Sequence, residues 1–272
     1  MNRFLVLMLV ATFCITGSYS QDVEDKVVQA GFVFNAGVLA TQFRTGQVES
    51  NGIGGSFGVG MGLNYNFKPH VAFYTGLEFN FENFKYAPTA GNNFYYNYSD
   101  KDILLNKNDQ STADGAMLLS ERKQNPITLT IPTMLIFRTN FIGYFRYYGK
   151  FGLRTSFVVN QTVTDKGVNI TYADNLPIEN NATLEKMKAP NDLLFIRVAG
   201  GMAAGAEWNF IGSTSLMFEA GFYYMFTPLF SGNGKDDRNS SSLYNVNADN
   251  SRTYRSFKAS QMLIEFKVGL LF

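Results

Sequence analysis

The chain has a single histidine, His70, and histidine is the side chain that most often acts as a general base near neutral pH. His70 follows Lys68 and Pro69 in a short turn sequence, and no serine and acidic residue stand beside it to complete a nucleophilic site. Neither a phosphate-binding loop nor a zinc-ligand spacing occurs in the sequence. We therefore predict a protein that is not an enzyme and that uses no metal or other cofactor.

Two polar stretches carry paired acidic residues of the kind that bind calcium. One holds Asp100 and Asp102, and the other holds Asp236 and Asp237 close to glycines. Neither stretch has the full ligand spacing of a calcium loop, so we interpret these carboxylates as solvated loop residues. The formal net charge of +1 also gives no reason to expect a nucleic-acid partner.

Ten other charged residues stand at alternate positions within apolar segments. They are Glu78, Glu82, Glu207, Glu219 and Glu265 on the acidic side and Arg146, Lys150, Arg154, Arg197 and Lys267 on the basic side. Charges that are removed from water must be paired, and here the two signs are equal in number. The sequence therefore predicts an interlocking ion-pair network inside the protein. The alternative is that the same charges line a narrow conduit for solutes.

The segment from Gly52 to Phe67 shows which element positions these charges. From Ile53 to Phe67 every second residue except Gly55 is bulky and apolar, and the residues between are glycine, serine or asparagine. A period of two over about 15 residues indicates a β-strand with two different faces, far longer than the roughly five or six residues usual in soluble domains. Strands of this length and alternation are typical of transmembrane β-barrels.

The same alternation recurs along the chain and predicts eight strands in all. The other seven are Gln29–Phe43, Val71–Phe84, Pro126–Arg138, Tyr144–Asn160, Leu193–Asn209, Leu216–Phe226 and Ser256–Phe272. Polar segments and tight turns alternate between them, and the three longest polar segments are Lys85–Asn125, Gln161–Asp192 and Thr227–Arg255. This order is typical of bacterial outer-membrane barrels, which have short periplasmic turns and long extracellular loops.

We therefore predict an all-β fold, an eight-stranded antiparallel up-and-down transmembrane β-barrel. A soluble ligand-binding barrel is the structural alternative, and it would turn the bulky faces of its strands inward. Eight strands leave an interior that side chains or one small ligand only just fill, whereas this chain has 26 phenylalanines. Charged residues make up only 17% of the chain, too few for a wall that faces water. The bulky faces are therefore expected to face lipid.

The first 20 residues have the pattern of an export signal. Arg3 precedes an apolar run from Phe4 to Ile15, and Ser18 and Ser20 then give a small-x-small cleavage site. A run of about a dozen apolar residues is too short for a spanning helix. We expect a signal peptide over residues 1–20, a barrel domain over residues 21–272, and a location in the bacterial outer membrane.

The last strand keeps its alternation to Phe272. A terminal phenylalanine preceded by spaced apolar residues looks like the C-terminal assembly signal that the barrel assembly machinery of the outer membrane reads. We therefore expect this machinery and outer-membrane lipid to be partners of the chain.

Two neighbouring segments carry a family resemblance. The segment Leu129–Leu135 reads Leu-Thr-Ile-Pro-Thr-Met-Leu, and the segment Tyr148–Gly152 reads Tyr-Gly-Lys-Phe-Gly. With Gln21 after the cleavage site and Glu219 in the seventh strand, they resemble the PorT-like outer-membrane β-barrel family of Bacteroidota. The resemblance implies a non-enzymatic barrel with an accessory role in the cell envelope or in protein secretion.

The first long loop holds a cluster of aromatic residues, Phe94, Tyr95, Tyr96 and Tyr98. Tyrosines offer large contact areas at low entropic cost, and exposed loops on rigid scaffolds are where binding residues concentrate. This pattern favours extracellular loops that bind a protein or glycan partner, with a small porin-like conduit as the alternative function. The alternative for the cluster itself is that the loop folds back on the barrel rim or touches lipopolysaccharide.

Overall fold

The computed structural model describes residues 27–105, 114–173, 176–189, 192–211, 214–231, 242–249 and 251–272, so the expected signal peptide lies outside the described residues. All regular elements in this part of the chain are strands, which confirms the all-β prediction. They are β1 (Val28–Phe43), β2 (Val48–Ser50), β3 (Gly54–Lys68), β4 (Val71–Pro88), β5 (Phe94–Ser99), β6 (Asp102–Ile103), β7 (Gly115–Arg138), β8 (Phe145–Ala173), β9 (Leu176–Lys188), β10 (Ile196–Ile211), β11 (Thr214–Met225), β12 (Tyr244–Val246), β13 (Arg252–Tyr254) and β14 (Ala259–Leu271).

Eight of these strands pair into a closed ring. Each of β1, β3, β4, β7, β8, β10 and β11 is antiparallel to the next, and β11 pairs with β14. The ring closes because β14 also pairs with β1, from Gly31 opposite Leu271 to Phe43 opposite Ala259. The sequence predicted eight strands in all, and this number is corrected here. The described residues form fourteen strands, of which eight make up the ring and six lie outside it.

Alternation along each ring strand separates a bulky outer face from a smaller inner face. On β3, Phe57 and Met61 point outward and are more than half exposed, at 53% and 58%. Glycines on the inner face leave room for large side chains of neighbouring strands. A Cβ atom on Gly62 would lie 2.8 Å from the ring of Tyr74, and one on Gly205 would lie 2.5 Å from the hydroxyl of Tyr148.

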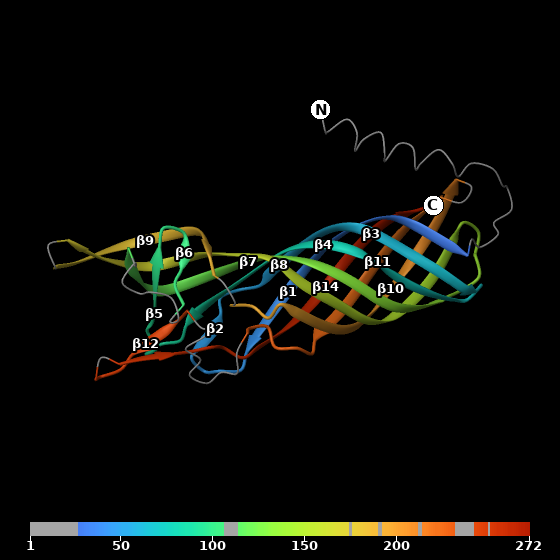
Figure 1. The fold of residues 1–272 in the computed structure, drawn as a ribbon. Helices are drawn as coiled ribbons and strands as arrows, with labels where there is room; N and C mark the ends of the chain where they lie inside the picture. The colour runs from blue at the N-terminus through green and yellow to red at the C-terminus, as the bar shows by residue number, and fades with distance from the viewer. Residues whose placement is uncertain are drawn as a thin grey trace, which may run out of the picture.

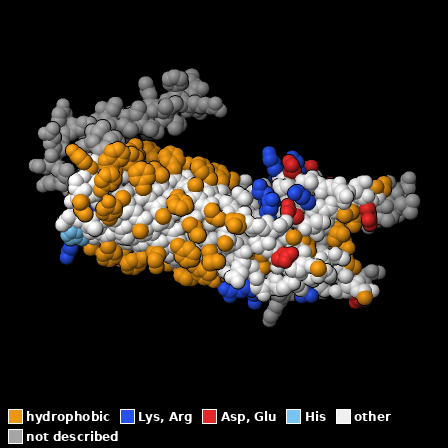
Figure 2. All heavy atoms as spheres, turned by 180° about the vertical axis from the view of Figure 1, so that it is seen from behind, with side chains coloured by type: hydrophobic (Ala, Val, Ile, Leu, Met, Phe, Trp, Pro, Cys, Tyr) orange, Lys and Arg blue, Asp and Glu red, His pale blue; other side chains and the backbone are white. Residues whose placement is uncertain are grey.

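The outward side chains of the ring form a continuous apolar surface, which we call the apolar belt. It includes Phe34, Val38, Phe57, Met61, Leu77, Phe79, Phe81, Leu135, Phe137, Phe151, Phe218, Phe222, Ile264 and Phe266. Figure 2 shows this belt covering one half of the molecule, with charged side chains gathered beyond one of its ends. No helix among the described residues is long and apolar enough to cross a membrane.

Past the belt, several strands continue into what we call the extension, a β-structure built on one end of the ring (Figure 1). Its anchor is β8, which pairs with β10 up to Phe157 and with β9 from Thr162 onward. Strand β7 follows β8 along most of this length, as far as Ala116 opposite Ile170. Short strands β5, β6, β12 and β13 add to the same sheet.

The extension corrects the expectation that the three long polar segments are irregular loops. The segments 85–125 and 161–192 contribute long parts of β7 and β8 and all of β5 and β9, and the segment 227–255 contributes β12 and β13. These strands carry polar residues on their outer faces because they project beyond the apolar belt. Their period-two pattern in the sequence is therefore weak, although their backbones pair as strands.

An apolar cluster fills the interior of the extension where it joins the ring. Its largest members are Phe84, Tyr86, Phe94, Tyr96, Phe230 and Phe257, all at most 2% exposed. Phe230 packs edge to face against Tyr86 and Phe257, with ring centroids 5.7 and 5.9 Å apart. This aromatic core lies at the end of the ring that faces the extension.

The aromatic cluster of the first loop belongs to this core, which corrects its expected role as an exposed contact surface. Phe94 and Tyr96 are fully buried and Tyr98 nearly so. Tyr95 is half-buried and stacks on Tyr244, with ring centroids 6.2 Å apart. The structure corresponds to the alternative in which the loop folds back on the barrel rim. Burying large aromatic rings is more favourable in free energy than leaving them in water.

Candidate functional site

The middle of the ring interior holds four charged residues from three strands. Arg154 of β8 contacts two carboxylates, with Nη2 2.9 Å from Glu78 Oε2 and Nη1 2.6 Å from Glu265 Oε1. Lys267 of β14 contacts the same two carboxylates, at 2.5 Å from Glu78 and 3.5 Å from Glu265. All four side chains are at most 5% exposed. Two cations and two anions therefore bridge β4, β8 and β14 across the interior.

A second ion pair lies beside this group. Lys150 Nζ is 2.6 Å from Glu219 Oε2, which also accepts a hydrogen bond of 2.9 Å from the hydroxyl of Tyr148. The ammonium group of Lys150 lies 4.1 Å from the centre of the Tyr74 ring. The Tyr74 hydroxyl donates to Glu78, which links the two groups.

The third group lies toward the tight turns. Arg146 of β8 donates to Glu207 of β10 through Nη2 at 2.5 Å and Nε at 3.0 Å. Arg138 adds a second cation, 3.7 Å from Glu207, and donates to Asn66 at 2.7 Å. Arg138 was not among the ten predicted charges. Its inward alternation with Met134 and Ile136 was the signal that could have found it.

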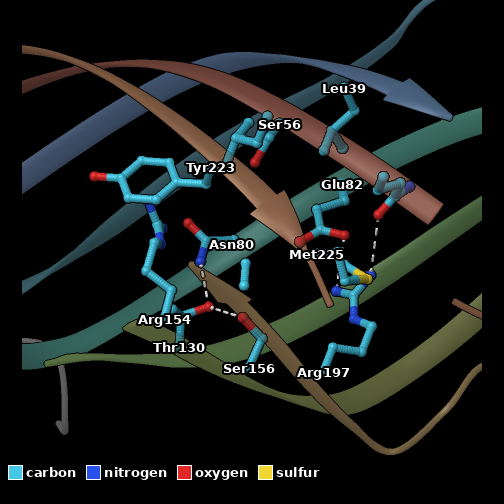
Figure 3. A pocket seen from close by; sticks show the side chains of 13 residues that line it. Leu39, Ser56, Asn80, Glu82, Thr130, Arg154, Ser156, Arg197, Tyr223 and Met225 are labelled. Atoms are coloured by element: carbon cyan, nitrogen blue, oxygen red, sulfur yellow. Dashed lines mark hydrogen bonds and ion pairs between the residues drawn. The ribbon is translucent and has the colours of Figure 1, made fainter. Parts of the chain in front are cut away.

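The fourth group lies toward the extension, around a small cavity (Figure 3). Arg197 Nη2 is 2.8 Å from Glu82 Oε2, and Glu82 accepts a further hydrogen bond from Thr128. Asn80 donates to Thr130, which is hydrogen-bonded to Ser156. The cavity between these groups has a volume of about 40 Å³, which leaves room for only a few water molecules. Water there would complete the hydrogen bonding of Arg197 Nε and Asn80 Oδ1, which have no protein partner among the described residues.

The structure thus brings all ten sequence-predicted charges into ion pairs inside the ring. Their positions follow from alternation, which turns these residues to the inner face of their strands. Because each cation lies against a carboxylate and the side chains fill the interior, this arrangement can brace opposite walls of the ring.

A further buried ion pair inside the extension was not predicted. Arg122 of β7 donates to both carboxylate oxygens of Asp165 of β8 at 2.8 Å, and both side chains are fully buried. Asp192 lies 3.5 Å from Arg122 and accepts a 2.5 Å hydrogen bond from Gln124. Burial raises the pKa of the Asp192 carboxyl, and the nearby Arg122 opposes that rise only in part. Sequence reasoning missed this group because its members lie in segments expected to be loops.

The single histidine lies at the turn end of the ring, beside the backbone of Arg138 from the third group. His70 Nδ1 is 3.2 Å from the backbone oxygen of Arg138, at the turn between β3 and β4. Residues 54–58 read Gly-Gly-Ser-Phe-Gly, the spacing of a nucleophile elbow, but Ser56 lies within β3 rather than at the strand-to-helix turn that an elbow requires. The described part of the chain holds no group of three or more side chains able to bind a metal ion.

The remaining predicted site residue is Phe272, at the end of the ring away from the extension. Its backbone nitrogen donates to the oxygen of Ala30 at 2.9 Å, continuing the ladder between β14 and β1. Its ring lies 6.1 Å from that of Phe32, centre to centre. Phe272 therefore continues the pairing of β14 with β1, and its ring lies beside that of Phe32.

Comparison with known proteins gives one family. The sequence model of a family described as "Outer membrane protein beta-barrel domain" matches residues 19–231. A search of the curated proteins gave no match.

Several solved structures are similar at low scores. Ail, the attachment invasion locus protein of Yersinia pestis, is 10% identical, with 90% of this chain and 98% of that chain covered at a TM-score of 0.30. The outer membrane protease OmpT from Escherichia coli is 9% identical, with 93% and 99% covered at 0.35. Neisserial surface protein A is 9% identical, with 88% and 97% covered at 0.25. TM-scores this low do not bear on function.

Proposed function

Because the chain belongs to the outer membrane protein beta-barrel domain family, we propose that it is a sealed, non-enzymatic transmembrane barrel that presents the extension to a partner outside the cell. The observation that carries this proposal is the pairing of β8. One continuous strand serves as barrel wall as far as Phe157 and as the spine of the extension from Thr162 onward. A folded structure is thereby held rigidly at one end of a membrane-embedded ring.

The apolar belt supports the transmembrane placement. Large apolar side chains cover the outer wall of the ring, whereas its inner wall carries the paired charges, an arrangement typical of outer-membrane barrels. Short turns such as the one at His70 lie at the end of the ring that also holds Phe272. We assign this end to the periplasm and the extension to the extracellular side, as expected for a barrel delivered by a signal peptide and inserted by the assembly machinery.

The interior of the ring supports a sealed barrel over a porin-like conduit. Ion pairs occupy the middle of the interior, and the cavity beside Arg197 and Glu82 holds only a few waters. The aromatic core around Phe230 lies at the extracellular end. A conduit would require both the ion pairs and the aromatic core to move. A porin-like conduit is therefore the alternative function, and a conductance measurement distinguishes it from a sealed barrel.

The resemblance to PorT-like proteins refines this proposal. It would make the partner a component of the cell envelope or of a protein secretion system. The surface best placed for such contact is the outer part of the β8–β9 hairpin, because Phe94, Tyr96 and Tyr98 of the cluster first considered for this role are buried. Ile178, which lies opposite Thr171 in this hairpin, is exposed.

A hairpin truncation tests the proposal. Replacing Thr171–Ile178 by Asn-Gly removes the tip but keeps Asn169, which accepts a hydrogen bond from Tyr98, and the whole aromatic core. We expect the full chain to fractionate with outer membranes, to show no single-channel conductance, and to crosslink in native envelopes to a partner that the truncated chain no longer captures. Recovery in the soluble periplasm contradicts the placement. Stepwise conductance supports the conduit, and unchanged crosslinking excludes the hairpin as the contact surface.

A further inference from the structure

Two lysines face each other on the outer wall of the protein where the ring meets the extension. Lys85 of β4 and Lys123 of β7 are directly opposite in the antiparallel register. The residues on either side of Lys123, Arg122 and Gln124, are fully buried inside the extension. Because side chains alternate along a strand, Lys123 and its partner Lys85 point outward.

Neither lysine forms an ion pair with a carboxylate of the described residues, whereas the nearby Lys166 lies 3.3 Å from Glu121. Directly opposite residues of an antiparallel pair have Cβ atoms about 5 Å apart, and like charges there destabilise the pairing. An anion held between the two ammonium groups would turn this repulsion into attraction.

The position of the two lysines along β4 and β7 indicates what kind of anion could reach them. Phe81 and Ile127 are opposite each other on the same two strands and belong to the outer apolar surface. The lysines lie four residues farther along, which is about 13 Å of strand. Asn83 and Asn125 stand between, so the outer wall changes there from apolar to polar. If the belt spans the membrane as proposed above, the lysines lie at the level of the outer-leaflet headgroups.

We propose that Lys85 and Lys123 together bind a phosphate group on the headgroup of an outer-leaflet glycolipid, whose acyl chains lie along the apolar belt below. Phosphate oxygens accept strong hydrogen bonds from ammonium groups, and the belt offers the matching apolar surface. A free phosphate ion would gain only the first of these contacts, whereas a lipid gains both. This inference rests on the proposed orientation of the barrel in the outer membrane.

Lipid binding to the full-length barrel in detergent micelles tests the site. Native mass spectrometry would measure the affinity for bisphosphorylated lipid A, for lipid A without phosphates, and for inorganic phosphate. The variants are Lys85→Gln, Lys123→Gln and the double variant. The matched control is Lys166→Gln, another lysine on the outer wall of the extension, which is already paired with Glu121.

Each lysine near an anionic lipid surface contributes roughly a fivefold change in affinity. We therefore expect about a 25-fold loss for bisphosphorylated lipid A in the double variant, about a fivefold loss in each single variant, and a change below twofold in Lys166→Gln. The phosphate-free lipid should bind all variants equally. Each variant must keep its heat-dependent gel mobility, which shows that the ring is intact, and the single variants serve if the double variant does not fold.

Equal affinity of the wild type and the variants for bisphosphorylated lipid A overturns the proposal. So does equal binding of inorganic phosphate at the same concentration, because the site would then hold a free ion. A wild-type barrel that resides in the outer membrane but binds no phosphorylated lipid refutes the lysine site alone. Absence of the protein from the outer membrane refutes the proposed function as well.

Discussion

Arg154 and Glu265 meet across the interior of the ring, with Nη1 of the arginine 2.6 Å from Oε1 of the glutamate. They stand on β8 and β14, and β10 and β11 separate these strands on one side of the ring. The same guanidinium also holds Glu78 of β4. One side chain therefore ties three parts of the wall together, which a pair between neighbouring strands does not do.

The first prediction concerns this cross-wall contact. Replacing Arg154 by Met should leave Glu78 and Glu265 with Lys267 as their only remaining cation within the central group. Breaking a buried ion pair by removing one partner costs about 3–5 kcal/mol, so we expect a loss of that order in the free energy of unfolding. Urea titration of the barrel in lipid vesicles, followed by fluorescence of the single Trp208, measures it.

Two variants control for this measurement. Adding Glu265→Gln to Arg154→Met should recover part of the loss, because one uncompensated carboxylate is then removed. Lys166→Met breaks an ion pair in which the lysine side chain is 60% exposed, and pairs of this kind contribute about 0–1 kcal/mol. An equal effect of Arg154→Met and Lys166→Met would show that the central group does not brace the ring.

The second prediction is that the extension can be destabilised while the ring stays intact. Phe230→Ala should open a cavity in the aromatic core, where Phe230 contacts Phe84, Tyr86 and Phe257. Truncating a buried phenylalanine costs about 3–5 kcal/mol. Hydrogen exchange should therefore accelerate in β5 and β12, while the gel mobility of the unheated ring stays unchanged. Phe195→Ala, at a side chain that is 62% exposed, is the control and should leave both unchanged.

The third prediction uses pH. Burial raises the pKa of Asp192 in the folded chain above the value of about 3.9 expected when unfolded. Its contribution to stability is then fully present below pH of about 4 and is lost as pH rises through the folded-state pKa. Asp192→Asn should therefore slow proteolysis of the extension relative to the wild type by a factor that grows from pH 4 to pH 7. A factor that is constant over this range contradicts the assignment.

The fourth prediction concerns Phe272. If the terminal aromatic residue is an assembly signal, its deletion should lower the amount of protein inserted in the outer membrane, measured by heat-dependent mobility in membrane fractions. Phe272→Tyr keeps an aromatic ring beside Phe32 and should insert at the normal level. Normal insertion of the deletion variant would leave only the ladder contact with Ala30 as the role of this residue.

The ring strands were predictable because lipid on one side and a packed interior on the other impose a strict period of two. The strand expected over Gly52–Phe67 occurs as β3, Gly54–Lys68. The strand expected over Pro126–Arg138 begins instead at Gly115. Its first half resembles a loop in sequence because it faces water and carries polar residues such as Lys123. Alternation identifies a strand only where its two faces meet different environments.

The charged residues show a similar limit. Alternation places Arg154, Glu78 and Glu265 on inner faces, but which of them meet depends on strand tilt and on how the ring closes. The pair of Arg122 with Asp165 was not predicted for a different reason. Both residues lie in parts of β7 and β8 that have no clear apolar face in the sequence. The predicted contact at Phe94–Tyr98 failed because sequence alone does not distinguish an aromatic cluster on a surface from one in a core.

The pairing of β1 with β14 has a consequence for how the chain folds. Gly31 lies opposite Leu271, so the seam of the barrel joins the most distant parts of the described sequence. Closing so long a loop costs more entropy than the seven shorter-range pairings, so we expect the seam to form last. Until it forms, both strands present open edges of unpaired backbone groups. The time between exposure of these edges and their closure is when the chain is most vulnerable to aggregation.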